Sequence, residues 1–250
     1  MYIDTHCHLY QEYYDDIDKL IKEIEDSGVK RIIVNGCDMK SNLEVLELVK
    51  KYDIVYGALG FHPTELDDYN EDCLSFLREH INDKKIVAIG EIGLDYHYEN
   101  TNKEKQIDVF KKQLNIASMY HKPVIVHSRD SINDTYNILS EYELKGSIHC
   151  FSGSLEMAKR FVKLGYCLGI GGVSTYKNAK NIINVIKDID LEYLLLETDS
   201  PYLSPVPHRG EKNTPCNIPI IAKKISEIKN IDISLVSRTT TDNADRLFDF

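Results

Sequence analysis

The chain has 250 residues, of which 42% are hydrophobic and 28% are charged, a balance typical of a globular protein with an extensive core. No apolar stretch approaches the roughly 18 residues of a membrane span, which argues against a membrane-embedded chain. The net charge of −10 argues against binding of long duplex DNA over the whole surface, because proteins that do so are usually basic.

Eight short runs rich in β-branched residues are spread along the chain. They predict strands over residues 2–8, 30–36, 53–60, 85–93, 123–128, 147–153, 166–172 and 193–199. Between them lie segments with apolar residues at helical spacing, such as 15–28 and 105–120. Gly28 suits the position just after a helix, and a further helix is expected over 233–250 with Asp232 or Ser234 as its N-cap.

Strands that alternate with helices of this length predict parallel βαβ units. Eight units in 250 residues indicate an α/β fold, the TIM (β/α)8 barrel, whose active sites lie at the C-terminal ends of the strands. A doubly wound open sheet is the alternative, but the glycine-rich phosphate turn that usually follows its first strand is absent. We find no linker and expect one metallohydrolase domain over residues 1–250.

The six cysteines are scattered and form no C-x-x-C pair. The N-terminus has no signal-peptide pattern. We therefore expect a reduced, cytoplasmic protein with no membrane partner, in which each cysteine is a small buried apolar group. The oligomeric state is open, with a monomer as the default.

Polar side chains mark the ends of five predicted strands. Because residues two apart share a face of a strand, Asp4, His6 and His8 are expected to point one way while Thr5 and Cys7 point the other. The same spacing pairs Ile89 with Glu91, Ile125 with His127, Ser147 with His149, and Glu197 with Asp199.

Each of these residues has an ordinary explanation by itself, as a cap or a solvated turn. Gathered at one end of a barrel, four histidines and two carboxylates would be costly unless they were paired or bound a metal. Imidazole and carboxylate without thiolate suit Zn²⁺, Mn²⁺, Ni²⁺ or Fe²⁺, with Mg²⁺ a further candidate. Six ligands exceed the roughly three of one open catalytic ion and suit two divalent ions that share a carboxylate.

Six motifs along the whole chain resemble the TatD family of metal-dependent deoxyribonucleases, in the amidohydrolase superfamily. They are IDTHCHL, GFHPTE, AIGEIGLDYH, KPVIVHSRDS, IHCFSGS and LLLETDSPYLSPVPHRGEKNTP. The resemblance implies one ion on His6, His8, Glu91 and Asp199. Glu91 would bridge to a second ion, which His127 and His149 would complete. The superfamily often bridges its metals with a carbamylated lysine, and the glutamate at position 91 fits the TatD family instead.

The resemblance also implies roles for residues outside the ligand set. His62 would lie beside the substrate. His208 and Arg209 follow the last strand, near the usual phosphate site of such barrels. The segment with Asn213, Pro215 and Asn217 would order that loop.

Three further carboxylates and two cysteines lie close to these positions in sequence. Asp95 either positions groups at the substrate or caps the next turn. Asp4 and Glu197 are expected one layer below the ligands, hydrogen-bonded to ligand imidazoles. Cys7 and Cys150 flank ligand histidines and are expected to point outward into the core.

The function implied is hydrolysis of DNA phosphodiester bonds from an end, with single-stranded or frayed DNA as the substrate. We expect a hydroxide activated by two metal ions to attack phosphorus, with Asp199 as the general base. Arg209 would stabilise the developing charge, and either His62 or His208 would protonate the leaving oxygen.

Three alternatives stay open. The same barrel supports hydrolysis at a carbon centre, such as an amide, a lactone or an ester, including an aminoacyl-tRNA ester. A phosphatase for small phosphoesters is the second, and a metal-bound binding module without catalysis is the third. Among the 16 tyrosines, Tyr96 and Tyr202 are candidates for stacking on bases, which would favour the nuclease.

Overall fold

The eight strands of the computed structural model, which describes residues 1–250, form one parallel sheet in the order β1 to β8. The strands are β1 Tyr2–Cys7, β2 Val29–Asn35, β3 Val55–Leu59, β4 Ile86–Asp95, β5 Val124–Arg129, β6 Gly146–Ile148, β7 Tyr166–Ile170 and β8 Leu194–Leu196. The segment after β8 closes the ring against β1, because Asp199 N–H donates to His6 O at 2.9 Å and His8 N–H donates to Ser200 O at 2.7 Å. The predicted TIM barrel is confirmed.

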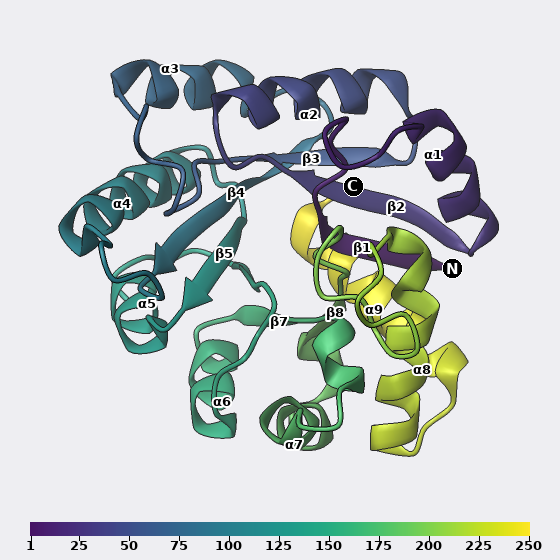
Figure 1. The fold of residues 1–250 in the computed structure, drawn as a ribbon. Helices are drawn as coiled ribbons and strands as arrows, with labels where there is room; N and C mark the ends of the chain where they lie inside the picture. The colour runs from purple at the N-terminus through teal and green to yellow at the C-terminus, as the bar shows by residue number, and fades with distance from the viewer.

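Helices alternate with the strands and surround them (Figure 1). The α-helices are α1 Ile17–Asp26, α2 Met39–Lys51, α3 Glu71–His80, α4 Lys103–Met119, α5 Ile132–Leu139, α6 Leu155–Lys163, α7 Lys180–Asp188, α8 Ile218–Lys229 and α9 Ile233–Phe248. Three short 3₁₀ helices are η1 Gly172–Thr175, η2 Leu191–Tyr193 and η3 Pro215–Asn217. None of the helices combines the length and hydropathy that crossing a bilayer requires.

Helix α1 shows how the local sequence sets the element bounds. The Asp16 side chain caps its start by accepting from Lys19 N–H, and its buried stripe recurs at helical spacing. Gly28, with φ +91°, takes the left-handed conformation that ends the helix, as predicted. The chain then turns directly into β2.

The core has two parts. A cluster of 57 buried residues fills the space between the strands and the surrounding helices. A second cluster of ten lies inside the barrel at the N-terminal half of the strands, where Ala244 and Phe248 of α9 pack against Ile3 and Leu195. The predicted C-terminal helix is therefore the floor of the barrel, with Asp232 as its N-cap. This apolar floor leaves only the opposite end of the barrel for polar chemistry.

Two strands break the expected alternation of side chains. Along β1, Asp4 pairs with Ile32 and Cys7 with Val34, so three steps on β1 match two on β2. The extra residue reverses the parity of the strand, and Asp4 lies opposite Ile32 of the outer core, on the other face from His6. The prediction that Asp4 shares a face with His6 and His8 was therefore wrong.

Strand β4 has the same irregularity. Ile89 pairs with Val124 and Ile92 with Val126, so that Ile89 packs in the outer core while Glu91 points inward. The predicted pairing of Ile89 with Glu91 on one face was therefore wrong. Beyond the bulge the alternation is regular again, and Asp95 stands on the same inward face as Glu91.

Candidate metal centre

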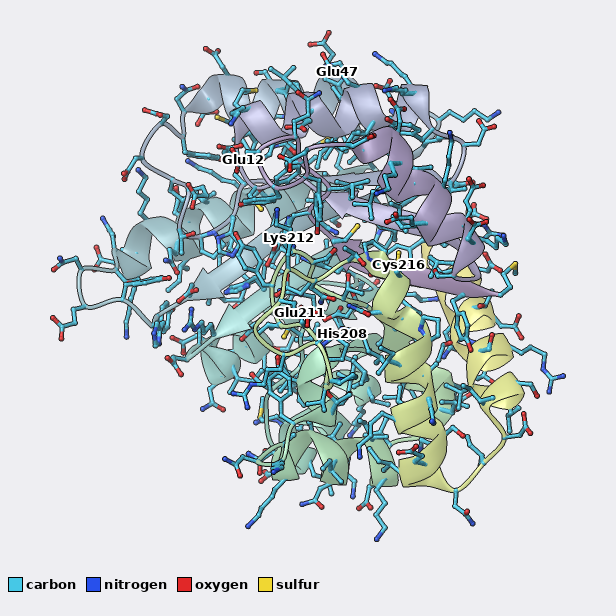
Figure 2. All side chains as sticks on the ribbon, turned by 45° about the vertical axis from the view of Figure 1, so that its right-hand side comes forward. Glu12, Glu47, His208, Glu211, Lys212 and Cys216 are labelled. Atoms are coloured by element: carbon cyan, nitrogen blue, oxygen red, sulfur yellow. The ribbon has the colours of Figure 1, made fainter.

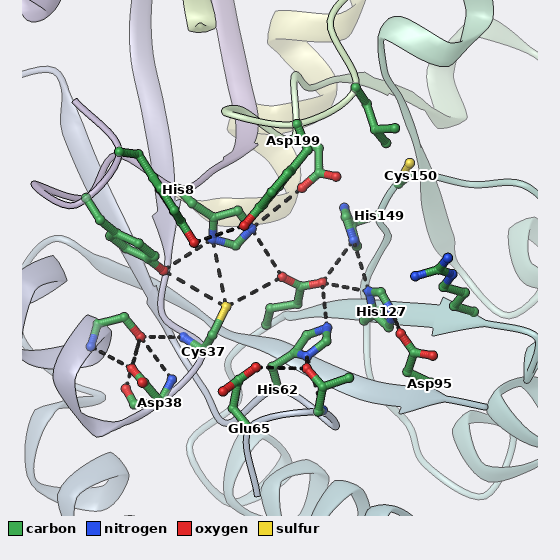
Figure 3. Close-up of a pocket in the computed structure, with 18 of the residues that line it drawn as sticks. His8, Cys37, Asp38, His62, Glu65, Asp95, His127, His149, Cys150 and Asp199 are labelled. Atoms are coloured by element: carbon green, nitrogen blue, oxygen red, sulfur yellow. Dashed lines mark hydrogen bonds and ion pairs between the residues drawn. The ribbon is translucent and has the colours of Figure 1, made fainter. Parts of the chain in front are cut away.

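A cavity of about 780 Å³ opens at the C-terminal ends of the strands, the face that the sequence predicted. Four histidines point toward a common centre within it, and Asp199 reaches the same centre from the segment after β8 (Figure 3). His6 lies beneath them and is fully buried. The structure thus brings together all six predicted ligands, which are His6, His8, Glu91, His127, His149 and Asp199.

One group of donor atoms comes from His6, His8, Glu91 and Asp199. Nε2 of His6 and Nε2 of His8 are 3.2 Å apart, and each lies 3.3–3.7 Å from Oε2 of Glu91 and Oδ1 of Asp199. The donor atoms of His6, His8 and Glu91 all lie within 4.8 Å of one another, as do those of His6, His149 and Asp199. Imidazole nitrogens and carboxylate oxygens gathered this closely suit a divalent cation.

The second oxygen of Glu91 serves a different group. Oε1 lies 2.8 Å from Nδ1 of His127 and 2.9 Å from Nε2 of His149, and those two nitrogens are 3.4 Å apart. His62 approaches the same oxygen with Nε2 at 3.5 Å. One carboxylate thus faces two clusters of nitrogen donors, which is the arrangement of a bridging ligand.

Hydrogen bonds on the far side of the rings aim the ring nitrogens. Nδ1 of His8 lies 3.1 Å from the carbonyl oxygen of Asn35, and Nε2 of His127 lies 3.1 Å from Oδ2 of Asp95. When each ring donates N–H to that acceptor, its other nitrogen is the one available to bind a cation at the centre. His6 has no such acceptor, and its ring stacks instead on His149 at 3.8 Å between centroids.

The electrostatics of the cluster favour added positive charge. Burial would raise the pKa of Glu91, but His149, His6 and His62 outweigh burial and hold that pKa well below its usual range. Burial would lower the pKa of His149, yet the charges of Glu91 and Glu197 raise it. The carboxylates are therefore ionised. Burial lowers the pKa of His6, but the neighbours of His8, His127 and His149 raise the pKa of each of these rings, which favours their protonated form when no cation is bound. A divalent cation satisfies the same demand, so the donor set fits a metal.

Asp95 belongs to the strand, not to the following loop. Strand β4 extends through Asp95, whose carboxylate is buried and reaches His127 on β5. Its other oxygen accepts from the backbone N–H of His97 at 2.9 Å. Burial would raise the pKa of Asp95, but these two hydrogen bonds lower it. Of the two roles that the sequence left open, the structure favours a positioning role, directed at a ligand histidine.

Glu197 and Asp4 have different hydrogen-bond partners. Glu197 Oε1 accepts from Cys150 N–H and lies 3.6 Å from Nδ1 of His149, so it faces a ligand imidazole but is too far away for the expected hydrogen bond. Gly169 makes room for it, because a Cβ there would collide with the Glu197 carboxylate. Asp4 instead accepts from the backbone N–H groups of His6 and Thr198. The prediction that Asp4 bonds an imidazole was wrong, because the bulge in β1 turns it away.

The loop after β8 holds Asp199 through its own network. Asn213 is buried, and its side chain donates to the carbonyls of Thr198 at 2.8 Å and Tyr202 at 2.7 Å. Its oxygen accepts from Asn217 at 2.8 Å. Asp199 has φ +55°, the left-handed conformation that Asp and Asn tolerate better than most residues. Asn213 therefore orders the segment that presents Asp199.

Of the three other predicted site residues, only His62 lines the cavity. Its Nδ1 accepts from Thr64 N–H at 3.2 Å, which leaves the proton on Nε2. Burial and the charge of His127 lower the pKa of His62 to about 3, so the ring is neutral. His208 lies on the loop surface paired with Glu211 at 3.0 Å (Figure 2), and the Arg209 guanidinium lies over the Tyr176 ring at 4.5 Å. Neither lines the cavity.

Several cavity residues were not identified from the sequence. Cys37 lies 3.8 Å from Nδ1 of His8, and Cys150 also lines the cavity, so the expectation that Cys150 points into the core was wrong. Cys150 has φ +44°, which breaks the alternation just after β6. Arg129 lines the cavity as well, and its position two residues after His127 was a usable signal.

Some of the tyrosines near the cavity mouth line the cavity and others do not. Tyr202 lines the cavity with Tyr13, whose hydroxyl is 2.9 Å from that of Tyr202. Tyr98 lines another part of the wall and is 57% exposed. Tyr96, the other tyrosine proposed for base stacking, does not line the cavity and packs against the outer core.

Comparison with known proteins agrees with the motifs. The family model described as "TatD related DNase" matches residues 3–249. The uncharacterized metal-dependent hydrolase YabD of Bacillus subtilis is 39% identical over 252 residues, covering 99% of each chain. The uncharacterized metal-dependent hydrolase YcfH of Escherichia coli K12 is 34% identical over 98% of this chain and 95% of its own. The crystal structure of YJJV, a TatD homologue from Escherichia coli K12, superposes with a TM-score of 0.95 at 32% identity, covering 100% of this chain and 98% of its own.

Proposed function

This chain belongs to the TatD related DNase family and is a metal-dependent hydrolase of that family, and from that premise we propose that it hydrolyses phosphodiester bonds of DNA from a strand end. The observation that carries the proposal is the carboxylate of Glu91, which presents one oxygen to each of two clusters of imidazole nitrogens. A centre of this form suits phosphoryl transfer, because the attacking and leaving oxygens of one phosphate both need stabilisation.

Two divalent cations are proposed at this centre. His6, His8, Glu91 and Asp199 would hold one, and Glu91 with His127 and His149 would hold the other. Bound there, the cations would polarise the phosphoryl oxygens and lower the pKa of a nearby water. The imidazole and carboxylate donors suit Zn²⁺, Mn²⁺, Ni²⁺ or Fe²⁺, and Mg²⁺ remains a candidate.

Asp199 is proposed as the general base. Only its Oδ1 faces the imidazoles of His6 and His8, and its side chain is 16% exposed at the cavity wall. Its pKa is held low by the hydrogen bond with His8 and by the charges of His149 and His6, against the effect of burial. An ionised carboxylate at this wall is placed to accept a proton from the attacking water through Oδ2.

His62 is the better placed of the two histidines proposed at the leaving oxygen. Its Nε2–H projects into the cavity next to Glu91, while His208 does not line the cavity and is paired with Glu211. The neutral ring donates a hydrogen bond to a phosphoryl or leaving oxygen and withdraws charge from it. Arg209, which the sequence suggested for this stabilisation, stacks on Tyr176 outside the cavity lining.

The cavity mouth suits a single strand. Tyr202 is 50% exposed, and its ring lies 6.3 Å from that of His8 and 6.0 Å from that of Tyr13. Exposed aromatic rings beside a hydrolytic centre provide a surface on which a base can stack without sequence preference. A cavity of about 780 Å³ is in the size range of small-ligand sites, which suits the terminal nucleotide of a strand.

Metal-free protein reconstituted separately with Mg²⁺, Mn²⁺ and Zn²⁺ tests the proposal. Each form is incubated with single-stranded DNA carrying a label at either the 5′ or the 3′ end, beside a panel of esters, amides and small phosphodiesters. We expect metal-dependent stepwise shortening of the DNA. An Asp199→Asn preparation purified in the same way controls for contaminating nuclease. Turnover of an ester or amide with intact DNA would move the function to a carbon centre, and turnover of small phosphoesters alone would make the protein a phosphatase.

A further inference from the structure

We propose that Arg129 binds the phosphodiester next to the scissile one, so that the protein grips a polynucleotide by two successive phosphates. The proposal rests on the proposed DNA hydrolysis and extends it to a second contact. Neither the ligand set nor the resemblance assigns a role to this residue. It lines the cavity and is exposed to solvent.

The position of Arg129 follows from strand geometry. It is the last residue of β5, two residues beyond His127, and it pairs in register with Asp95 on β4. Side chains two apart on a strand share a face and are separated by about 6.6 Å along it. Arg129 therefore stands on the inward face one layer above His127, toward the cavity mouth. That separation resembles the spacing of neighbouring phosphates along an extended strand.

The charge of Arg129 is not neutralised by the protein. Asp95 is engaged by His127 at 3.1 Å, and the adjacent Asp130 is paired with His97 at 3.0 Å. The guanidinium has no ion pair or side-chain hydrogen bond of its own, and its nearest aromatic group is Tyr98, whose ring centroid is 5.9 Å away. Lys40, the other Lys or Arg that lines the cavity, is paired with Glu12 at 2.7 Å.

An exposed arginine without an ion pair is available to bind an anion. Its planar fork can bind two phosphate oxygens at once, which a lysine cannot do. A chain with net charge −10 needs local positive charge where it binds a polyanion. Arg129 lies beside the cluster of His127 and His149, so we expect it to bind the phosphate backbone of the substrate and not its bases.

The experiment compares a short oligothymidylate with the dinucleoside monophosphate TpT, which contains only the scissile phosphate. For Arg129→Ala we expect KM for the oligonucleotide to rise roughly 10- to 100-fold, with TpT kinetics unchanged. The salt dependence of binding should weaken by about one phosphate contact. Arg129→Lys should recover part of the loss, and Arg238→Ala, which removes an exposed arginine from α9, should match the wild type.

A binding measurement removes the dependence on turnover. In an Asp199→Asn background with metal supplied, fluorescence anisotropy of a labelled oligothymidylate should show the same loss of affinity for Arg129→Ala. Three results would overturn the Arg129 contact and leave the proposed DNA hydrolysis standing. They are unchanged KM and affinity in Arg129→Ala, equal losses on the oligonucleotide and on TpT, and a loss in Arg209→Ala in place of Arg129→Ala. A wild-type protein that cleaves neither oligonucleotide nor TpT would reject the proposed DNA hydrolysis, and the Arg129 contact with it.

Discussion

The carboxylate of Asp95 lies 3.1 Å from Nε2 of His127, measured from Oδ2, and this contact joins two neighbouring strands at the rim of the metal centre. Because His127 donates from Nε2, its Nδ1 is left facing Glu91 at 2.8 Å. The tautomer of a proposed ligand is therefore set by a residue that does not itself approach the centre.

Asp95→Asn should weaken the second of the two proposed metal sites and spare the first. A neutral amide has one acceptor oxygen for the two N–H groups of His127 and His97 that Asp95 now serves. We expect affinity at the second site to fall about 10- to 100-fold. Metal titration followed by elemental analysis should show bound metal falling toward one ion per chain. Asp130→Asn, which removes an exposed carboxylate paired with His97, is the matched control. Two tightly held ions in Asp95→Asn would contradict the positioning role.

Asp199→Asn should abolish turnover and preserve the fold. The position has φ +55°, which asparagine tolerates, and the substitution keeps the shape of the side chain while removing its basicity. We expect kcat to fall roughly 10²- to 10⁴-fold, the range for loss of a general base. Kinetics on labelled single-stranded DNA with metal supplied, beside thermal unfolding of the metal-free protein, separate the two effects. Near-normal kcat in a folded, metal-loaded variant would remove Asp199 from this role.

Tyr202→Ala should weaken binding of DNA, whereas Tyr202→Phe should not. The ring next to His8 supplies the stacking surface, and the hydroxyl only bonds that of Tyr13. Stacking of one base contributes about 1–3 kcal/mol, so KM for single-stranded DNA should rise roughly 5- to 150-fold in the alanine variant. A substrate whose terminal nucleotide is abasic should not distinguish the alanine variant from the wild type. A penalty that persists on the abasic substrate would mean that Tyr202 acts by packing.

The raised pKa of Asp4 predicts that the stability of the metal-free protein depends on pH. Complete burial is the main cause that raises its pKa from 3.8 to about 8, against the hydrogen bonds from Thr198 and His6. A carboxyl whose folded pKa is raised stabilises the fold fully below the unfolded pKa, and this contribution is lost as pH rises through the folded pKa. The loss thus occupies the window between about pH 4 and pH 8, with a slope of at most about 1.4 kcal/mol per pH unit.

Asp4→Asn isolates that contribution. Asparagine is neutral like the protonated acid, and its oxygen can accept from the N–H groups of His6 and Thr198 as Asp4 Oδ1 does. The Thr198 hydroxyl, which donates to the other oxygen of Asp4, can instead accept from the amide and donate to Ser200. The difference in unfolding free energy between wild type and variant, measured with urea at several pH values, should therefore favour the variant increasingly from pH 4 to pH 8. A difference that is constant over this window would show that Asp4 does not change its protonation there.

Much of the fold and of the proposed ligand set was predictable because both depend on local periodicity. Runs rich in β-branched residues identified all eight strands, and the polar residues at their ends marked the face of the barrel that carries the centre. Parity also held for Ile125 with His127 and for Glu197, which faces His149. These patterns survive because each strand alternates its side chains as long as its register is unbroken.

The positions of the loop side chains could not be predicted in this way. His208 pairs with Glu211 of the same loop, Arg209 lies over Tyr176 from the segment after β7, and neither lines the cavity. No spacing in the sequence reports such partners. The extension of β4 through Asp95 likewise depends on pairing with Arg129 of β5.

The sequence by itself determined the barrel, the end at which polar groups gather, and the identities of the six residues proposed to bind metal. Only the tertiary structure decided that Asp4 and Ile89 face away from the centre, that Asp95 holds His127, and that Arg129 is the unpaired cation at the cavity. The physical reason is that alternation is a property of one strand. Bulges, register and charge pairing are set between strands, by contacts that form only when the barrel closes.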